Sequence, residues 1–193
     1  MLQIKATDTR TNQEKILSEK ELLDFDSFEI DYLDTVFDYD DFDSDDVELA
    51  KVNGLPDYIE DTNEDIESAV NAYIELDNDT LWKTSLDLAT SAHDLSEIAE
   101  TASALNDDDK MELYLEYANY LNYVPSVSQF EENYQGEFKS KEDFAYNLIH
   151  QGVISADEIV QEHGTIEEWA EGDLRFDYEF IELGNSVHVF IVH

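Results

Sequence analysis

The chain contains no cysteine, and this absence excludes both a disulfide framework and a cysteine-ligated zinc site. Basic residues are scarce: 10 Lys and Arg stand against 49 Asp and Glu, so the 193 residues carry a formal net charge of −39. The sequence therefore has no basic patch to neutralise the phosphates of nucleic acid or of an anionic membrane. Long apolar runs are missing too, since neither a signal peptide nor a run of about 18 apolar residues occurs. These absences predict a soluble, cytoplasmic protein that binds neither nucleic acid nor membrane.

Apolar residues, by contrast, are plentiful. The chain is 42% hydrophobic and 12% aromatic, and these residues are spread through the acidic ones from end to end. Acidic disordered segments lack the apolar residues needed to offset the entropy of ordering. The chain is therefore predicted to fold, and to do so against strong repulsion between its own charges.

The surplus charge can be compared with that of nucleic acid. Duplex DNA carries one charge per about 1.7 Å of axis, so the net charge of −39 corresponds to about 66 Å of duplex, or about 20 base pairs. A compact chain of this length has a radius of gyration of about 16 Å and a diameter of about 40 Å. We therefore expect an elongated molecule with the charge density of DNA, and basic DNA-binding surfaces as its partners.

The predicted fold class is α+β, in an elongated chain of three domains. Residues 1–55 are expected to form a small antiparallel β/α domain of ββαβ pattern. Leu2–Ala6 and Gln13–Leu17 suit a hairpin, Ser18 and Glu21 form a capping box for a short helix, and Phe28–Tyr32 alternates like a half-buried strand.

The most acidic stretch of the chain, residues 34–46, follows within this first domain. An EF-hand loop starting at Asp41 would need glycine at its sixth position and glutamate at its twelfth, but Asp46 and Val52 stand there. A solvated acidic loop is therefore preferred over a calcium site. Its candidate phosphate-mimicking residues are Asp38, Asp40, Asp41, Asp43, Asp45 and Asp46.

Residues 56–123 are predicted to form a helical domain of four helices. On the fourth helix Asp108, Glu112 and Glu116 recur every four residues, about 6 Å apart along the axis, and so share one face. They are candidates for phosphate imitation, although a chance solvated face has the same spacing. The expected N-terminal caps of the four helices are Thr62 or Asn63, Asp79 or Thr80, Asp94 or Ser96, and Asn106.

Residues 124–193 are predicted to form three short helices followed by a β-hairpin. Arg175–Leu183 and Val187–Val192 alternate on either side of Gly184-Asn185, a two-residue hairpin turn. The helices are marked by capping boxes at Ser140 with Asp143, Ser155 with Glu158 and Thr165 with Glu168, and by glycines at 152 and 164.

The run FEENYQGEFKSKEDFAYNLI, Phe130–Ile149, resembles the signature of the ArdA antirestriction proteins, in which an acidic, aromatic YQGE segment precedes a helix of the S-x-E-D-[FY]-A kind. The resemblance is clearest over residues 95–193 and continues to the terminal VHVF, Val187–Phe190. The family's Tyr-Asp-Tyr segment has its nearest counterpart in Phe176-Asp177-Tyr178, with Phe in place of the first Tyr.

The resemblance implies a curved, acidic homodimer that imitates bent B-form DNA and occupies the DNA-binding groove of type I restriction-modification enzymes. Such proteins are made by phages and mobile elements. Two copies of this chain would carry −78. Enzyme residues that normally meet phosphates would meet carboxylates, and binding would weaken as salt rises.

Around the YQGE segment, the candidate partner-binding acids are Glu131, Glu132 and Glu137. Tyr134 is interpreted as a packed core residue and Gly136 as a turn residue with positive φ.

No enzyme activity and no cofactor are predicted. The five histidines are scattered, His188 is expected to be an exposed structural residue, and no HExxH, GxSxG, P-loop or GxGxxG motif occurs. Pairs of carboxylates are too numerous to indicate glycosidase chemistry. The alternative functions are inhibition of another defence nuclease such as a CRISPR effector, a calcium or polycation buffer, and an acidic chaperone for basic proteins.

Overall fold

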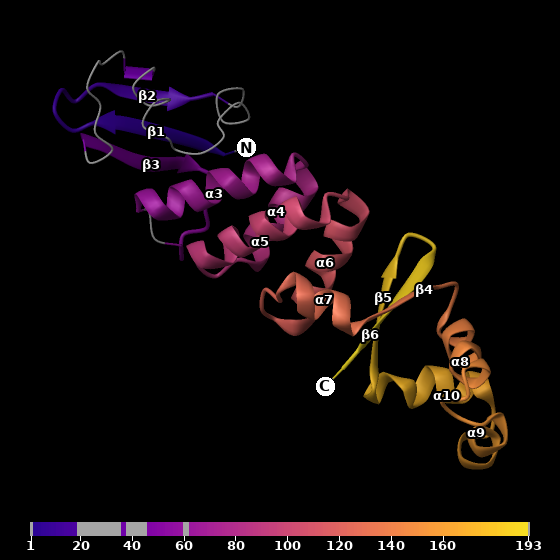
Figure 1. Cartoon of the computed structure of the whole chain (residues 1–193). Helices are drawn as coiled ribbons and strands as arrows, with labels where there is room; N and C mark the ends of the chain where they lie inside the picture. The colour runs from indigo at the N-terminus through magenta and orange to yellow at the C-terminus, as the bar shows by residue number, and fades with distance from the viewer. Residues whose placement is uncertain (1, 19–35, 38–45, 60–61, 193) are drawn as a thin grey trace. The chain divides into compact units, whose positions relative to one another are not determined.

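The computed structural model describes residues 2–18, 36–37, 46–59 and 62–192 (Figure 1). Contacts divide the chain into two compact units, residues 1–126 and 127–193, and each is described by itself. Each unit combines helices with a three-stranded antiparallel sheet, which confirms the predicted α+β class. The three-domain layout and the elongation stay predictions.

The sheet of the first unit has the order β2-β1-β3. Strands β1 (Gln3–Asp8) and β2 (Glu14–Leu17) form the predicted hairpin, and β1 also pairs antiparallel with β3 (Val47–Asn53). The sequence interpretation assigned β3 to no element. The helix predicted after Ser18 and the strand predicted at Phe28–Tyr32 lie outside the described residues.

Four helices follow, as predicted: α3 (Asn63–Leu76), α4 (Asp79–Leu88), α5 (Ala92–Leu105) and α6 (Asp108–Leu121). Helices α3 and α5 pack against each other through fully buried residues such as Ile66, Val70, Leu95 and Ile98. Every fourth or third residue is apolar on these faces, so burial selects the helical period.

The N-terminal caps of these four helices were predicted less well than their presence. Thr62 caps α3 in a capping box with Asp65, as expected. The other N-caps are Asn78, Ser91 and Asp107, each upstream or downstream of the predicted residues. Asn106, predicted to open α6, is instead the left-handed residue that ends α5, with φ 45°. Asn and Asp can serve at either end of a helix, and here they are adjacent.

The second unit contains α7 (Val127–Asn133), β4 (Tyr134–Phe138), α8 (Lys141–His150), α9 (Ala156–His163), α10 (Ile166–Gly172), the 3-10 helix η2 (Leu174–Phe176), β5 (Tyr178–Leu183) and β6 (Ser186–Ile191). Ser140 and Thr165 cap α8 and α10 as predicted, and the N–H of Ser155 donates to the Glu158 carboxylate at 3.3 Å. The hairpin of β5 and β6 is confirmed.

The prediction for this unit missed two elements and misplaced one boundary. Helix α7 was not among the three predicted helices. Strand β4 was not expected either, yet it pairs with β6 and makes the hairpin part of a sheet of order β4-β6-β5. Arg175 and Phe176 lie in η2, not in a strand, so β5 begins only at Tyr178. Phe144, Trp169 and Val189 belong to the core that joins the helices to this sheet.

Candidate partner-binding surface

The acidic row of α6 is solvent-exposed. Asp108, Glu112 and Glu116 are all exposed, while Met111 and Tyr114 are among the buried residues of the same helix. The predicted common face therefore exists, and burial of the apolar stripe orients it towards solvent. Successive members are about 6 Å apart along the axis of α6, whereas each strand of DNA carries one phosphate per about 3.4 Å of duplex axis.

Hydrogen bonds hold the N-terminal end of this row. The Asp107 side chain accepts from the backbone N–H of Lys110 at 3.2 Å and caps α6. The amide of Asn78 donates to the Asp108 carboxylate at 3.3 Å, which ties the start of α6 to the start of α4. A carboxylate at this position also interacts favourably with the helix dipole.

Acids at helix starts are a general feature of the chain. The positive end of the helix dipole offsets part of the repulsion between them, by about 0.3–1 kcal/mol for each favourable site. This placement reduces repulsion in a chain that has only 10 Lys and Arg for 49 Asp and Glu. The first-turn acids of the described helices are Glu64, Asp65, Asp79, Asp94, Asp108, Asp109, Glu142, Asp143, Asp157, Glu158, Glu167 and Glu168.

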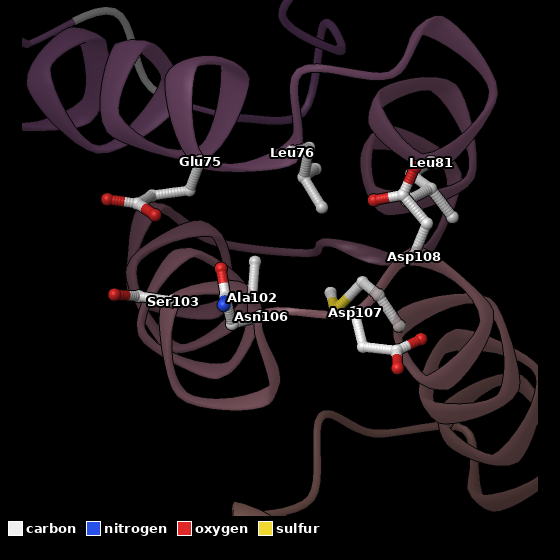
Figure 2. A pocket seen from close by; sticks show the side chains of 9 residues that line it. Glu75, Leu76, Leu81, Ala102, Ser103, Asn106, Asp107 and Asp108 are labelled. Atoms are coloured by element: carbon white, nitrogen blue, oxygen red, sulfur yellow. The ribbon is translucent and has the colours of Figure 1, made fainter.

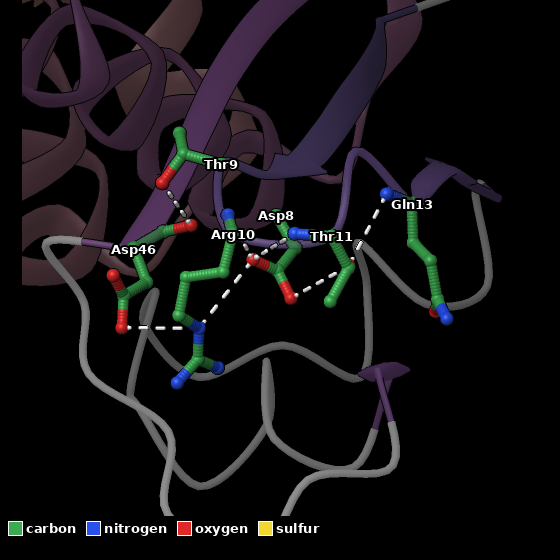
Figure 3. Close-up of polar contacts among 6 residues, drawn as sticks. All are labelled: Asp8, Thr9, Arg10, Thr11, Gln13 and Asp46. Carbon is green, nitrogen blue, oxygen red and sulfur yellow. Dashed lines mark hydrogen bonds and ion pairs between the residues drawn. The ribbon is translucent and has the colours of Figure 1, made fainter.

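Of the acidic-stretch candidates, only Asp46 is described; Asp38, Asp40, Asp41, Asp43 and Asp45 lie outside the described residues, as do residues 41–45 of the calcium loop considered above. The Asp46 carboxylate lies 3.2 Å from Nε of Arg10, and its backbone oxygen accepts from the Thr9 hydroxyl at 3.0 Å (Figure 3). The same oxygen accepts from the Thr9 N–H at 2.7 Å. Asp46 therefore fastens β3 to the β1–β2 turn, and its charge is partly neutralised.

The turn itself is organised by Asp8, which sequence reasoning identified only as turn-forming. The Asp8 side chain is fully buried and accepts from the Arg10 N–H at 2.7 Å and from the Thr11 hydroxyl at 3.0 Å (Figure 3). Nε of Arg10 lies 3.6 Å from the same carboxylate. Burial requires these bonds, because an ionised carboxylate without partners would be far too costly to desolvate.

The candidate acids of the second unit are also exposed. Glu131 and Glu132 lie on α7 and Glu137 on β4. The Ser128 hydroxyl donates to Glu132 at 3.4 Å, and the Ser186 hydroxyl donates to Glu137. The structure thus orients two of these three carboxylates.

The residues beside them are structural, as interpreted, with corrections. Tyr134 is half-buried, stacks on Phe130 and shares a hydrogen bond of 2.9 Å with Nδ1 of His188. His188 is consequently half-buried and not exposed as predicted. Gly136 does have positive φ, 119°, but in a β-bulge of β4 and not in a turn.

Burial and nearby carboxylates raise the pKa of several tyrosine hydroxyls. The pKa of Tyr114 is raised to about 12, mainly by burial; a hydrogen bond with Thr101 lowers it in part, and Glu97 and Asp94 add smaller increases. Burial likewise raises the pKa of Tyr58, with Asp87 and Asp94 adding to it, and that of Tyr134, with Glu137 adding to it. In each case a nearby carboxylate disfavours the phenolate.

A hollow of about 210 Å³ lies next to the acidic row, among helices α3 to α6 (Figure 2). Glu75 and Ser103 lie on one side of it and Asp107 and Asp108 on the other. Sequence reasoning missed this hollow, because its walls come from four helices and no local pattern marks it.

Two further searches were limited to the described parts of the chain. No group of three or more His, Asp or Glu side chains there is placed to hold a metal ion. Within the same residues, no helix has the length and apolar character needed to cross a membrane.

Comparison of the chain with protein-family models, with curated proteins and with solved structures gave no match. The resemblance to the ArdA proteins accordingly stays a prediction that rests on residues 95–193 of the sequence.

Proposed function

We propose that the chain is a DNA-mimicking inhibitor that occupies the DNA-binding groove of a type I restriction-modification enzyme. The observation that carries this proposal is the exposed row Asp108, Glu112 and Glu116, spaced about 6 Å apart along the axis of α6, on a chain of net charge −39. The resemblance of residues 130–149 to the ArdA signature supports the choice of target.

The mechanism is competitive occupation, and it needs no catalytic group. Lys and Arg residues that grip phosphates in the enzyme groove bind carboxylates instead, as charge-assisted hydrogen bonds. Counterions held by the two charged surfaces are released, so affinity falls as salt rises. In this proposal the inhibitor acts as a homodimer, which doubles the charge presented to the groove.

Many carboxylates share the binding energy. Exposed ion pairs contribute about 0.2–1 kcal/mol each, so a single substitution changes affinity little. Removal of several acids from one face is required to test the proposal.

The test is a gel-shift competition between the purified chain and a fluorescent duplex for a type I methyltransferase core at low salt. The chain is expected to displace the duplex at near-stoichiometric amounts. Retention of the duplex at a large molar excess of the chain would contradict the proposal.

A matched assay separates this function from that of an acidic chaperone. The chain is titrated into an unrelated basic protein of similar size and charge to the methyltransferase core. Inhibition through DNA mimicry predicts much weaker binding to that protein, because its cations are not arranged along a duplex-shaped groove. Equal affinity for both proteins would favour the chaperone.

A further inference from the structure

The hollow beside the acidic row is partly open, with buried apolar side chains at its base and carboxylates around its rim. Leu76, Leu81 and Met111 line it, and each is less than 5% exposed. The carboxylates of Glu75, Asp107 and Asp108 stand around it on exposed positions. Its volume of about 210 Å³ equals that of roughly seven water molecules, enough for one long side chain.

The rim carboxylates have no cationic partner in the described part of the chain: the ion pairs of its Lys and Arg residues all involve other acids. Lys110 is exposed on α6 but lies two positions from Asp108, on another face of the helix. The hollow therefore presents uncompensated negative charge over an apolar base.

From this arrangement we propose that the hollow binds one arginine side chain of a protein partner. This inference rests on the proposed function, because it assumes a partner with a basic surface. It adds a specific contact to a binding mode that otherwise depends on distributed charge.

Arginine fits this site better than lysine does. Glu75 and Asp107 lie on opposite sides of the hollow, with Asn106 also on its wall (Figure 2). A planar guanidinium carries five N–H donors in a fixed fork and can bridge acceptors on two sides, whereas an ammonium is a compact, strongly hydrated point charge. The aliphatic stem of arginine can cover the apolar base while its head reaches the rim.

The site also has fixed elements. Asp107 is held as the N-cap of α6, Asp108 by its bond to Asn78, and Asn106 by its place at the end of α5. Little conformational freedom is lost when a ligand meets such preorganised groups. Glu75, at the exposed end of α3, completes the rim.

The test uses N-acetyl-arginine amide as probe and the full chain, observed by NMR through the side-chain amide of Asn106. Saturable shifts of this signal are expected with the arginine probe, and much smaller ones with N-acetyl-lysine amide. Equal shifts with the two probes, or no saturable response, would overturn the proposal. Because no restriction enzyme is present, the outcome is independent of whether the proposed function holds.

Two variants distinguish binding of the probe in the hollow from its nonspecific attraction to the negative charge of the chain. The triple variant Glu75→Gln, Asp107→Asn, Asp108→Asn removes three charges but keeps the shapes and the cap, and is expected to weaken probe binding about tenfold. Ser103→Phe keeps every charge but places a ring at an exposed rim position, and is expected to abolish the Asn106 response. The control is Glu48→Gln, Glu67→Gln, Glu182→Gln, which removes the same charge at exposed positions elsewhere. An equal loss in this control, or full binding in Ser103→Phe, would contradict the assignment.

Discussion

Tyr114 shows how burial and charge act together on one residue. Its side chain is fully buried, and its hydroxyl donates to the carbonyl oxygen of Pro125 at 2.7 Å. Burial and the carboxylates of Glu97 and Asp94 all favour the neutral phenol, so its pKa is raised to about 12. In the unfolded chain the same group has its ordinary pKa of about 10.

This difference predicts a loss of stability at high pH. Below pH 10 the phenol is protonated in both states, and its contribution is fully present. Between about pH 10 and 12 the unfolded chain releases the proton first, so the free energy of unfolding falls by about 2 kcal/mol. Urea unfolding at several pH values measures this fall. It should be shallower in Tyr114→Phe and unchanged in Tyr146→Phe, which alters an exposed tyrosine; identical profiles for all three proteins would refute the interpretation.

At the scale of elements, the shortage of glycine shapes how helices end. The chain has 6 glycines, and helices α3, α5 and α6 end instead on Asp77, Asn106 and Asn122, all with positive φ. Asn and Asp tolerate the left-handed region better than other non-glycine residues do. Gly54 is a position that requires glycine, because its φ is 103° and a Cβ there would lie 2.7 Å from the Leu2 side chain.

Gly136 provides a direct test in the second unit. Its φ of 119° within β4 is rarely adopted by residues with a side chain, so Gly136→Ala is expected to destabilise the chain by about 1–3 kcal/mol. The matched change Gly172→Ala, in α10 with open space around it, should be neutral or stabilising. Thermal unfolding of the two variants measures the difference. Equal effects would mean that the bulge in β4 is not under this constraint.

The acidic row on α6 predicts opposite effects on stability and on binding. In Glu112→Gln, Glu116→Gln the two like-charge i,i+4 pairs of the row are removed, and the helix should gain a few tenths of a kcal/mol for each. Displacement of DNA from the methyltransferase core should nevertheless require more protein. The control Glu48→Gln, Glu67→Gln loses the same charge away from the row and should compete nearly as well as the parent chain. If both double variants compete equally, the row has no special role.

Apart from α7, the described helices could be predicted, but part of the sheets and the hollow could not. Apolar periodicity and caps such as Thr62 and Ser140 are local signals, and they marked those helices. Strands β3 and β4 pair with β1 and β6, which are distant in sequence, so no local pattern marked them. The row on α6 follows from spacing alone, whereas Glu75 and Asp108 meet across the hollow only because tertiary packing brings α3 and α6 together.

The net charge of −39 on the whole molecule opposes folding, because like charges repel one another in the compact state. With 10 Lys and Arg for 49 Asp and Glu, most carboxylates cannot be paired with a Lys or Arg side chain, so repulsion is reduced mainly by exposure, helix dipoles and solvent ions. The same uncompensated charge is what a basic groove can recognise. Stability and binding should therefore respond to salt in opposite directions.

Salt is expected to stabilise the free chain. The Debye length falls from about 30 Å at 0.01 M to about 3 Å at 1 M, so repulsion between exposed carboxylates is screened. The midpoint of thermal unfolding should rise steadily with NaCl, and equally with KCl. A midpoint that is independent of salt would show that the carboxylates are already compensated in the folded state.

Calorimetric titration of the chain into a type I methyltransferase core, alone and saturated with a cognate duplex, tests the central claim most directly. Occupation of the DNA groove predicts stoichiometric binding to the free core, little or no binding to the DNA-saturated core, and an affinity that falls steeply between 50 and 200 mM salt, by about 100-fold or more. Equal binding to the free and DNA-saturated cores would contradict the account.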